Sequence, residues 1–526
     1  MKIRQRGTLI CLCVVALTPL LRAQTPTTPH SFNRQFGTTS DDFAFSVAED
    51  ASSIYVAGYQ NDVDVVPAFN PCRTSAESTA VESFLRKYSD FGTESSGFIA
   101  PGTYAINRDV AVDSGGNIYV VGQQAGIAYV RKYGPSGGTP QWSSPFGPAG
   151  TVPFSVAVNA AGVYVAGEFN NGTNSDGIVS GYTSTGTWTW TQSITGSASA
   201  YDSARGIAAD ATAVYVVGYV DFSGTSSPDA DAFVSKYAAA DGTLLWANQP
   251  IGTPADDFAY DVATNGRAVY IVGETQGILG QATFGAQDAF VQQYDFSGNL
   301  LWTRQFGTPS ADFAVGVTVG GGGTYVVGYT GGQLPGQTPL GQSDAYVRKY
   351  NSSGNDVWTT QFGTSAQDAA FGVSSAGGDV YVSGCTNGKL PGQNKVGGDI
   401  SVDSDAFFAK NPQFPVLVTG QNNGPLTIKL GSQGAVPVAI LSTDTFDATT
   451  VNPTSISLAG ASVNLKGNGT YMASAQDVNG DGRLDLVVHV ATEALELSET
   501  DTEAVLEGET FAGQAIIAKY LVRIVP

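Results

Sequence analysis

Residues that carry oxygen atoms at alternate positions form the clearest candidate for a chemical site in this sequence. The stretch DVNGDGRLD, residues 477 to 485, contains five of them. Asp477, Asn479 and Asp481 would offer side-chain oxygens to a cation. Arg483 would add its main-chain carbonyl, and Asp485 would complete the shell. A ligand set made of oxygens suits calcium, so we predict a structural calcium ion as the cofactor of this loop.

The spacing of these ligands excludes an EF-hand. Position twelve of such a loop would be Val488 instead of a bidentate glutamate, and strand-like patterns flank the loop on both sides. The stretch resembles instead the shorter, nine-residue calcium loops of extracellular β-proteins. An ordinary turn rich in Asp and Gly remains the alternative.

Other catalytic chemistry has little support in the sequence. The chain contains only two histidines, His30 in a leader rich in Thr and Pro and His489 on a predicted strand. We therefore expect no Ser-His-Asp hydrolase within the repeats described below. No cluster of His and Cys has the spacing of a zinc site, and no glycine motif suggests a phosphate site.

Aspartates recur at two positions of a repeated unit. The first set begins the first strand of the unit and the second set begins the third strand. Their members are Asp42, Asp202, Asp257, Asp312 and Asp368, and then Asp176, Asp231, Asp288, Asp344 and Asp405. A ring of ligands or an acid/base pair is one interpretation. We favour the other, in which each Asp accepts backbone N–H bonds in a turn, because catalytic residues need not repeat whereas turn chemistry must.

The elements that would position these residues follow a regular period. Trp246, Trp302 and Trp358 lie 56 residues apart. Each unit contains four short stretches rich in β-branched and aromatic residues, separated by Gly, Asn, Asp and Ser. The second-strand signature, as in AVYIVG, occurs seven times, ending at Gly58, Gly122, Gly167, Gly218, Gly273, Gly328 and Gly384. Repeats of about 50 residues with four strands predict a seven-bladed β-propeller over residues 31–412.

The first and last parts of this region complement each other. The seventh unit has no Trp-containing fourth strand after Asn411, while a spare strand, SFNRQFGT at residues 31–38, precedes the first unit with Phe32 in the place of Trp302. We predict that this N-terminal strand completes the last blade and closes the ring, which removes the open sheet edge.

The repeats resemble a known family. Stretches such as GYTGGQLPGQTPLGQSDAYVRKY at residues 328–350 are similar to the bacterial seven-bladed β-propeller (SBBP) repeat proteins. The match is close in units five to seven and looser in the first three, where LPGQ is absent. This resemblance implies the fold much more firmly than an activity, because propellers host many unrelated functions.

The composition changes after about Pro415, which predicts a second domain over residues 413–526. Alternating runs such as VPVAIL and LDLVVHV suggest a small β-sandwich that carries the calcium loop. The sequence around this loop, as in VPVAILSTDTFDATTV, resembles a module that is appended to many secreted bacterial proteins.

The N-terminus predicts export. Lys2, Arg4 and Arg6 precede an apolar run and a small-residue site near Ala23, so residues 1–23 have the pattern of a signal peptide and residues 24–30 that of a leader. Removal of the signal leaves 21 basic residues against 46 acidic ones, which argues against nucleic acid and anionic membranes as partners. We expect a secreted or cell-surface monomer that is not inserted in a membrane.

The two cysteines outside the signal, Cys72 and Cys385, are predicted to form a disulfide. They are far apart in the sequence, but ring closure would make the first and seventh blades neighbours, and an exported chain meets oxidising conditions. Two unpaired thiols are the alternative.

The function that these features favour is a binding and interaction scaffold for an unidentified protein or glycan ligand. The alternative is an enzyme that acts on extracellular polysaccharide through a carboxylate pair on one propeller face. A redox propeller with a bound quinone is a third candidate, because DGTLLWANQ at residues 241–249 is similar to the Trp repeats of quinone-dependent dehydrogenases, although those enzymes would show eight units.

Overall fold

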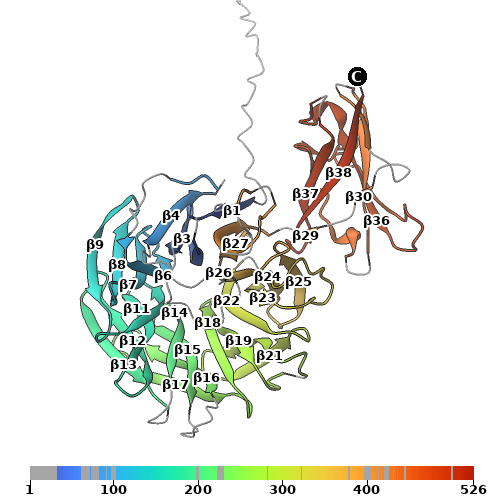
Figure 1. Ribbon diagram of the computed structural model, residues 1–526. Helices are drawn as coiled ribbons and strands as arrows, with labels where there is room; N and C mark the ends of the chain where they lie inside the picture. The colour runs from blue at the N-terminus through green and yellow to red at the C-terminus, as the bar shows by residue number, and fades with distance from the viewer. Residues whose placement is uncertain are drawn as a thin grey trace, which may run out of the picture.

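The structure is a computed structural model that describes most of the chain between residues 32 and 525 (Figure 1). The residues outside this description are 1–31, 39, 61–71, 73–81, 91, 96–101, 197–200, 222–229, 281, 321–322, 377–378, 392, 396–403, 413, 416–417, 420–425, 431, 444–445, 499–500 and 526. The predicted signal peptide, the leader and His30 therefore lie outside the described residues. No helix in the described ranges is long and apolar enough to cross a membrane.

Four-stranded antiparallel sheets make up the repeat region, and six of them consist of strands that are consecutive in the chain. Their strands are β2 (Phe43–Glu49), β3 (Ser53–Gln60), β4 (Glu82–Ser89) and β5 (Gly102–Thr103); β6 (Ala105–Val112), β7 (Ile118–Gln124), β8 (Ile127–Gly134) and β9 (Gly137–Pro145); β10 (Val152–Val158), β11 (Val163–Asn170), β12 (Ser175–Tyr182) and β13 (Trp188–Ile194); β14 (Ser203–Ala209), β15 (Ala213–Asp221), β16 (Ala230–Ala238) and β17 (Leu244–Ile251); β18 (Asp257–Thr264), β19 (Ala268–Thr275), β20 (Asp288–Asp295) and β21 (Leu300–Phe306); and β22 (Asp312–Gly320), β23 (Gly323–Thr330), β24 (Asp344–Tyr350) and β25 (Asp356–Phe362).

A seventh sheet in the described residues combines both ends of the repeat region. Its strands are β26 (Asp368–Ala376), β27 (Asp379–Thr386), β28 (Asp405–Lys410) and, in the outer position, β1 (Phe32–Phe36). Phe32 lies opposite Lys410 in the register of β1 and β28. Trp358 lies opposite Lys349 at the equivalent place in the sixth sheet, so Phe32 occupies the position of the repeated tryptophan.

The apolar core of this region lies between the sheets. All eight residues of β19, the second strand of its sheet, are buried, which explains why the second-strand signature reads as a nearly continuous apolar run. Tyr215 and Val217 of β15 share one buried cluster with Val262 and Ile271 of the next sheet. Each sheet therefore depends on its neighbours to cover its two faces.

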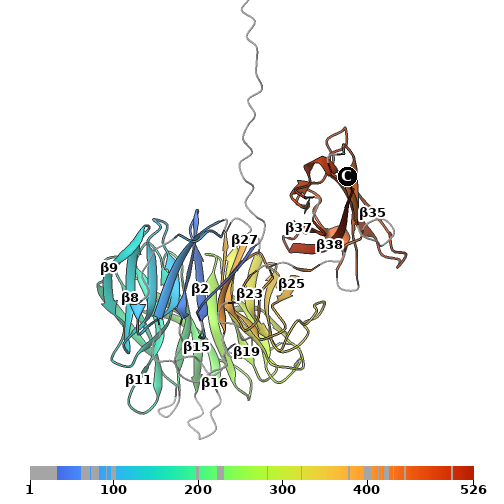
Figure 2. The same ribbon diagram turned by 45° about the horizontal axis from the view of Figure 1, so that its top comes forward.

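The first strands of the sheets contact one another in a cycle. Going round it, β2 contacts β6, and the contacts continue through β10, β14, β18, β22 and β26 back to β2. Figures 1 and 2 show the sheets fanning out around these inner strands. The all-β, propeller-like architecture predicted from the repeats is thus confirmed.

The C-terminal strands form two further sheets (Figure 1). One contains β29 (Phe414–Pro415), β31 (Leu426–Lys429), β33 (Ser457–Leu458), β34 (Ala461–Ser462), β37 (Glu503–Glu509) and β38 (Ala515–Val525); the other contains β30 (Val418–Thr419), β32 (Ala435–Ile440), β35 (Ala473–Gln476) and β36 (Asp485–Ala491). There are two short 3-10 helices in this described region: η2 (Ala448–Thr450) lies between β32 and β33 in the sequence, and η3 (Thr492–Ala494) lies between β36 and β37. Ile428, Val438, Val488, Leu506 and Ile516 from both sheets share one buried cluster.

Deletion of residues 31–38 should destabilise the repeat region. The deletion removes β1 and leaves the outer edge of β28 unpaired, and the two half-buried phenylalanines of β1 alone contribute roughly 3 kcal/mol through burial. We expect aggregation or a fall in the thermal midpoint, measured by size-exclusion chromatography and calorimetry. Deletion of residues 24–30 is the matched control. A 31–38 deletion variant that stays monomeric and equally stable would contradict the role of β1.

Candidate functional site

One residue in each first strand of the repeat region is displaced by a β-bulge. The strand pairing shifts by one position at this residue in all seven sheets. A bulge redirects the side chain of the extra residue, and all seven side chains line one cavity. We call this set the bulge ring; its members are Phe45, Arg108, Phe154, Arg205, Tyr260, Val315 and Phe371.

The cavity lies along the axis of the inner strands. Its volume is about 520 Å³, which falls within the range of roughly 300 to 1,000 Å³ that is typical of small-molecule sites. Beyond the bulge ring it is lined by other residues of the same strands. Some are small or apolar, such as Ala48, Ala111 and Ile207, and three are acidic, namely Glu49, Asp109 and Asp261. Aromatic rings and groups of both charges therefore line one channel.

Two arginines of the bulge ring flank an aromatic member. The guanidinium carbon of Arg205 lies 4.0 Å from the ring centroid of Phe154, and that of Arg108 lies 5.5 Å from it. Arg205 also donates from Nη2 to the Tyr219 hydroxyl at 2.9 Å and lies 3.7 Å from a carboxylate oxygen of Glu168. Its Nε is buried and has no hydrogen-bond partner in the described part of the chain.

Burial affects the pKa of both arginines, with a different net result for each. It lowers the pKa of Arg108 to about 10, so this side chain stays charged at neutral pH. Burial also acts to lower the pKa of Arg205, but the neighbouring Tyr219 and Glu168 outweigh it, and the pKa is raised. Two positive charges therefore persist in a largely apolar channel.

A buried carboxylate contacts Tyr260, the next member of the bulge ring after Arg205. The Tyr260 hydroxyl donates to Oε1 of Glu274 at 2.6 Å. Burial raises the pKa of Glu274 to about 7, and its Oε2 has no hydrogen-bond partner among the residues that the structure describes. Arg205 Nε and Glu274 Oε2 thus leave one unused donor and one unused acceptor near the bulge ring.

Two aspartates next to the bulge ring line the cavity without repeating in every sheet. Asp109 Oδ1 accepts from the Ser46 hydroxyl at 2.5 Å, and its Oδ2 accepts from the backbone N–H of Val156 in the next sheet at 2.7 Å. Asp261 bonds in the same way to the backbone N–H of Val317 at 2.8 Å. These carboxylates connect adjacent sheets, and burial raises the pKa of both, that of Asp261 to about 7.

The recurring aspartates of the two sequence positions have turn roles. Asp312 Oδ2 accepts from the backbone N–H and the hydroxyl of Thr308, and Asp368 Oδ2 accepts from Thr364 in the same way. At the second position, Asp344 accepts from the N–H of Leu340 and from the Gln361 amide. The turn interpretation of the recurring carboxylates is confirmed at these positions, and none of them lines the cavity.

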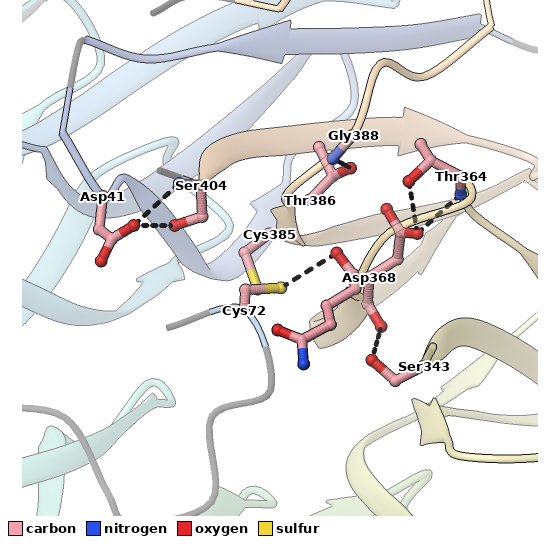
Figure 3. The surroundings of a disulfide bond; sticks show 10 residues. Asp41, Cys72, Ser343, Thr364, Asp368, Cys385, Thr386, Gly388 and Ser404 are labelled. Atoms are coloured by element: carbon pink, nitrogen blue, oxygen red, sulfur yellow. Dashed lines mark hydrogen bonds between the residues drawn. A yellow bond between two sulfur atoms is a disulfide. The ribbon is translucent and has the colours of Figure 1, made fainter. Parts of the chain in front are cut away.

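The structure contains the Cys72–Cys385 disulfide that the sequence suggests, with the two α-carbons 6.2 Å apart (Figure 3). Both cysteines are fully buried in a cluster with Phe43, Tyr59 and Tyr329. Members of the bulge ring, among them Phe45 and Phe371, pack against this cluster. The disulfide therefore lies next to the bulge ring and connects the insert of the first sheet to β27 of the seventh.

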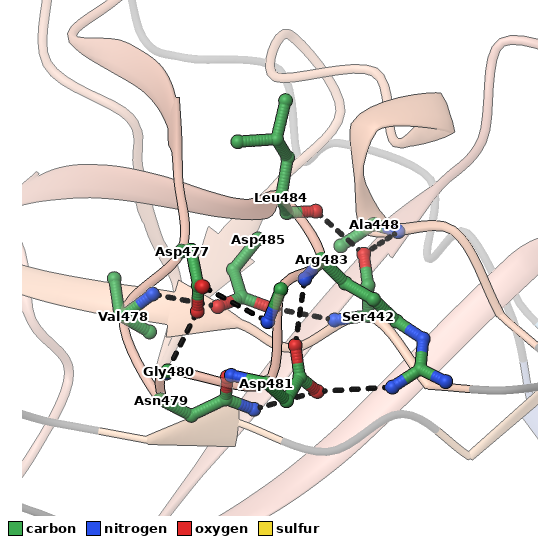
Figure 4. A network of polar contacts seen from close by, with 11 residues as sticks. Ser442, Ala448, Asp477, Val478, Asn479, Gly480, Asp481, Arg483, Leu484 and Asp485 are labelled. Atoms are coloured by element: carbon green, nitrogen blue, oxygen red, sulfur yellow. Dashed lines mark hydrogen bonds and ion pairs between the residues drawn. The ribbon is translucent and has the colours of Figure 1, made fainter.

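The predicted calcium loop is an exposed turn whose oxygens already accept hydrogen bonds (Figure 4). Asp477 accepts from the N–H groups of Gly480 and Gly482, and Asp481 accepts from the backbone N–H and guanidinium of Arg483. In the described residues, no group of three or more His, Cys, Asp or Glu side chains is arranged to hold a metal ion.

The fifth predicted ligand, Asp485, differs from the others. It is fully buried, and it accepts from the backbone N–H groups of Ser442 and Val478 at 2.8 and 2.9 Å. This aspartate thus connects the loop, through Val478, to the segment that follows β32, through Ser442. His489 lies on β36, and its backbone pairs there with neighbouring segments.

Comparisons with known proteins find partial similarities but assign the chain to no family. No family model matches the chain. A segment is 30% identical over 201 residues to the regulatory protein FlaEY of Caulobacter vibrioides, covering 36% of this chain and 20% of that protein. The chain therefore spans about a fifth of the length of this relative.

Several solved structures show limited similarity. The Dos1 propeller is 12% identical with a TM-score of 0.39, covering 71% of this chain and 94% of that one. Drosophila Plexin A in complex with Semaphorin 1b is 8% identical with a TM-score of 0.38, covering 72% and 86%. The polysaccharide lyase Uly1 is 10% identical with a TM-score of 0.39, covering 72% and 98%.

The bulge ring is the feature that reasoning from the sequence missed. Its residues are of four different types, so a search for residues that are identical in all units does not reveal them. A different signal could have found them, namely a position at fixed spacing before the second-strand signature where the side chains differ in charge and size from unit to unit. Variation within an otherwise regular unit is what a ligand site in a repeat protein requires.

Stability should increase as the pH falls from 8 to 5. Glu49, Asp261 and Glu274 have pKa values raised to about 7, and Asp312 and Asp368 to about 6, in each case mainly by burial. The folded chain therefore binds more protons than the unfolded chain between the ordinary carboxyl pKa and these values, so stability is lost as the pH rises through them. Thermal midpoints between pH 5 and 8 check this.

The Asp261→Asn variant separates this effect from the general repulsion of an acidic chain. Asn does not titrate, so the variant should show a smaller change of midpoint across the same pH range, although its loss of one acceptor lowers the midpoint at every pH. An identical pH slope in the variant and the natural chain would contradict the assignment to Asp261.

Proposed function

We propose that this protein is a secreted or cell-surface binding scaffold whose ligand site is the axial channel at the bulge ring. The proposal includes the finer architecture: seven blades of the SBBP type, closed by β1. Support for closure comes from the pairing of β1 with β28 and from the cycle of inner-strand contacts. The disulfide and the lack of a membrane-spanning helix in the described ranges are compatible with an extracellular protein.

The observation that carries the binding proposal is the chemical variety of the bulge ring. Seven equivalent bulges in a repeated framework hold three Phe, two Arg, one Tyr and one Val. Structural needs alone would favour one residue type at equivalent positions. Aromatic surface with a few oriented charges in an apolar cavity is typical of small-ligand sites, and the faces of sugars pack well on such rings.

The enzyme alternative requires a carboxylate pair that is free to exchange protons and contact substrate. Three carboxylates line the cavity without repeating in every sheet, namely Asp109, Asp261 and Glu49. The oxygens of the two aspartates accept backbone N–H bonds from two sheets, and these bonds hold each aspartate carboxylate in one position. Of the three, only Glu49 has a buried oxygen without a hydrogen-bond partner among the described residues. Because a catalytic pair needs two carboxylates that can contact substrate, this arrangement favours binding over polysaccharide cleavage.

An array of glycans and peptides tests the proposal. The natural chain should bind a defined subset, and Arg205→Met should weaken that binding by about tenfold or more, because a charge-assisted hydrogen bond of this kind is worth about 1.5 to 3 kcal/mol. Arg86→Met is the matched control, because Arg86 also stacks on phenylalanines and pairs with an acid but does not line the cavity. Equal loss in both variants, or no binding by the natural chain, would count against the channel.

The same samples test the enzyme alternative. Release of reducing ends or unsaturated products from polysaccharides that the array identifies would favour catalysis. In that case Asp261→Asn should abolish turnover while leaving binding intact, whereas the binding proposal expects no turnover in either protein.

We also propose that the 477–485 loop binds calcium as a structural ion. The residues fit in part: Asp477, Asn479 and Asp481 are exposed, and their side-chain oxygens lie on one short loop, with Asn479 Nδ2 3.1 Å from Asp481 Oδ2. Both carboxylate oxygens of Asp485 accept backbone N–H bonds, so this residue could bind calcium only through their remaining lone pairs. Bound calcium would replace N–H donors as the partner of the loop carboxylates and would stiffen the connection to β36.

Chelation should lower the melting temperature of the C-terminal domain and leave the propeller transition unchanged, because an ion that binds only the folded state stabilises it. Calorimetry with EDTA and with added calcium measures this. Asp481→Ala should remove the calcium dependence, while Asp447→Ala, on the exposed η2 cap of the same domain, should preserve it. An absence of any heat in calcium titration of the full chain would refute the proposal.

A further inference from the structure

At four boundaries of the repeat region, one sheet holds the hairpin turn of the next sheet. The turn at residues 351–355 of the sixth sheet shows how: Trp302 Nε1 donates to the carbonyl of Ser352 at 3.4 Å, and Arg304 Nε donates to that of Gly354 at 2.6 Å. The same tryptophan contact recurs at three other sheet boundaries, from Trp142 to Ser184, from Trp190 to Ala239 and from Trp246 to Phe296.

A lysine on the third strand adds a second donor to two of these turns. Lys236 Nζ donates to the carbonyl of Phe296 at 3.2 Å, the same carbonyl that Trp246 contacts at 3.0 Å. Lys132 and Trp142 share the carbonyl of Ser184 in the same way. A lysine and a tryptophan opposite each other in one sheet thus form a two-donor site for one turn carbonyl of the following sheet.

The sixth sheet carries this two-donor site as well, in Lys349 and Trp358. The seventh sheet offers it no hairpin turn, because β28 ends at Lys410 and the outer strand β1 comes from the other end of the chain. The site that faces the missing turn is nevertheless filled. Both donors bond to the carbonyl of Ala512 in the C-terminal domain, Lys349 Nζ at 2.9 Å and Trp358 Nε1 at 3.3 Å.

Ala512 lies in the turn that joins β37 and β38, and this turn has the internal hydrogen bonds of a blade turn. Thr510 N–H donates to the Gln514 carbonyl and Gly513 N–H to the Thr510 carbonyl. In the 351–355 turn, Asn351 N–H donates to the Asn355 carbonyl and Gly354 N–H to the Asn351 carbonyl. The fourth residue is a glycine with positive φ in both turns, 81° at Gly513 and 73° at Gly354.

Two details differ between the two kinds of turn. The acceptor carbonyl belongs to the third residue at Ala512, whereas it belongs to the second residue at Ser352. Gly354 packs against the Trp302 ring, whereas Gly513 lies near Lys349 Nζ and not against the Trp358 ring. Gln514 adds a contact from the domain side, since its buried amide donates to the Thr359 carbonyl at 3.1 Å and to the Thr360 hydroxyl at 3.3 Å. The two turns therefore share their internal hydrogen bonds and a tryptophan donor, with a shift of one residue.

We propose that the 510–514 turn acts as a surrogate for the missing hairpin turn of the seventh sheet, so that the C-terminal domain is docked on the ring through the site that joins one sheet to the next. Figure 1 shows the C-terminal strands beside β24 and β25, where this contact lies. The C-terminal domain then has a fixed orientation to the axial channel and covers polar donors that would otherwise face solvent. The proposal is independent of the ligand and of calcium.

Small-angle X-ray scattering of the full mature chain tests the docking. The natural chain should scatter as one compact particle of the shape in Figure 1. The Lys349→Met, Trp358→Phe double variant removes both donors while keeping the apolar volume, and should lower the ratio of docked to undocked molecules on the order of a hundredfold. The maximum particle dimension and radius of gyration should then increase.

The Lys236→Met, Trp246→Phe double variant is the matched control, because it removes the same two donors from a boundary inside the ring. It should lower the thermal midpoint without changing the particle dimension. Gln514→Ala removes a contact that the C-terminal domain supplies and changes no side chain of the repeat region. It should also increase the radius of gyration and the maximum particle dimension, but less than the Lys349→Met, Trp358→Phe variant does. Unchanged scattering in both Lys349 and Gln514 variants, or an equal increase in the Lys236 control, would overturn the proposal.

Discussion

The burial of both faces of every sheet by its neighbours is the constraint on which the repeat region depends. A strand such as β19, in which every residue is buried, cannot exist at the edge of a molecule or in an isolated sheet. The sheets must therefore contact each other in a cycle, and a cycle has no end at which an apolar face stays open. The outer position of the seventh sheet has to be filled for the same reason, and β1 fills it.

This constraint separates the parts of a unit that must repeat from the parts that can vary. The second strand is largely buried in all seven sheets, and the turn aspartate and the boundary tryptophan recur in most of them. The bulge residue lines the axial cavity, where its contacts differ from sheet to sheet; Arg205, for example, contacts Phe154 and Glu168 of the preceding sheet. Arg205, Phe154 and Val315 can therefore occupy equivalent positions in one framework, which gives the channel its chemical variety.

The sequence predicted the features that follow from periodicity. The four strands of a unit, the turn role of Asp312 and its equivalents and the pairing of Cys72 with Cys385 all rest on contacts that recur or on the adjacency of the first and last units. The bulge ring was not predicted, because a bulge depends on pairing geometry and leaves no fixed residue type. The contact of Ala512 with Lys349 was not predicted either, since it is made by a main-chain carbonyl, which any residue could supply.

The pairing of β1 with β28 has a consequence for the order in which the chain can fold. The first strand of the ring is synthesised first, yet its partner lies at residues 406–410, and the disulfide joins residues 313 positions apart. Contacts this distant along the chain require the ends of a long loop to meet, so they form slowly and late. Until β28 has been synthesised the N-terminal strand lacks this partner, and the six consecutive sheets can assemble before it. The pairing of β1 therefore depends on the completion of the last sheet, so a chain truncated before β28 would leave its first strand without this partner.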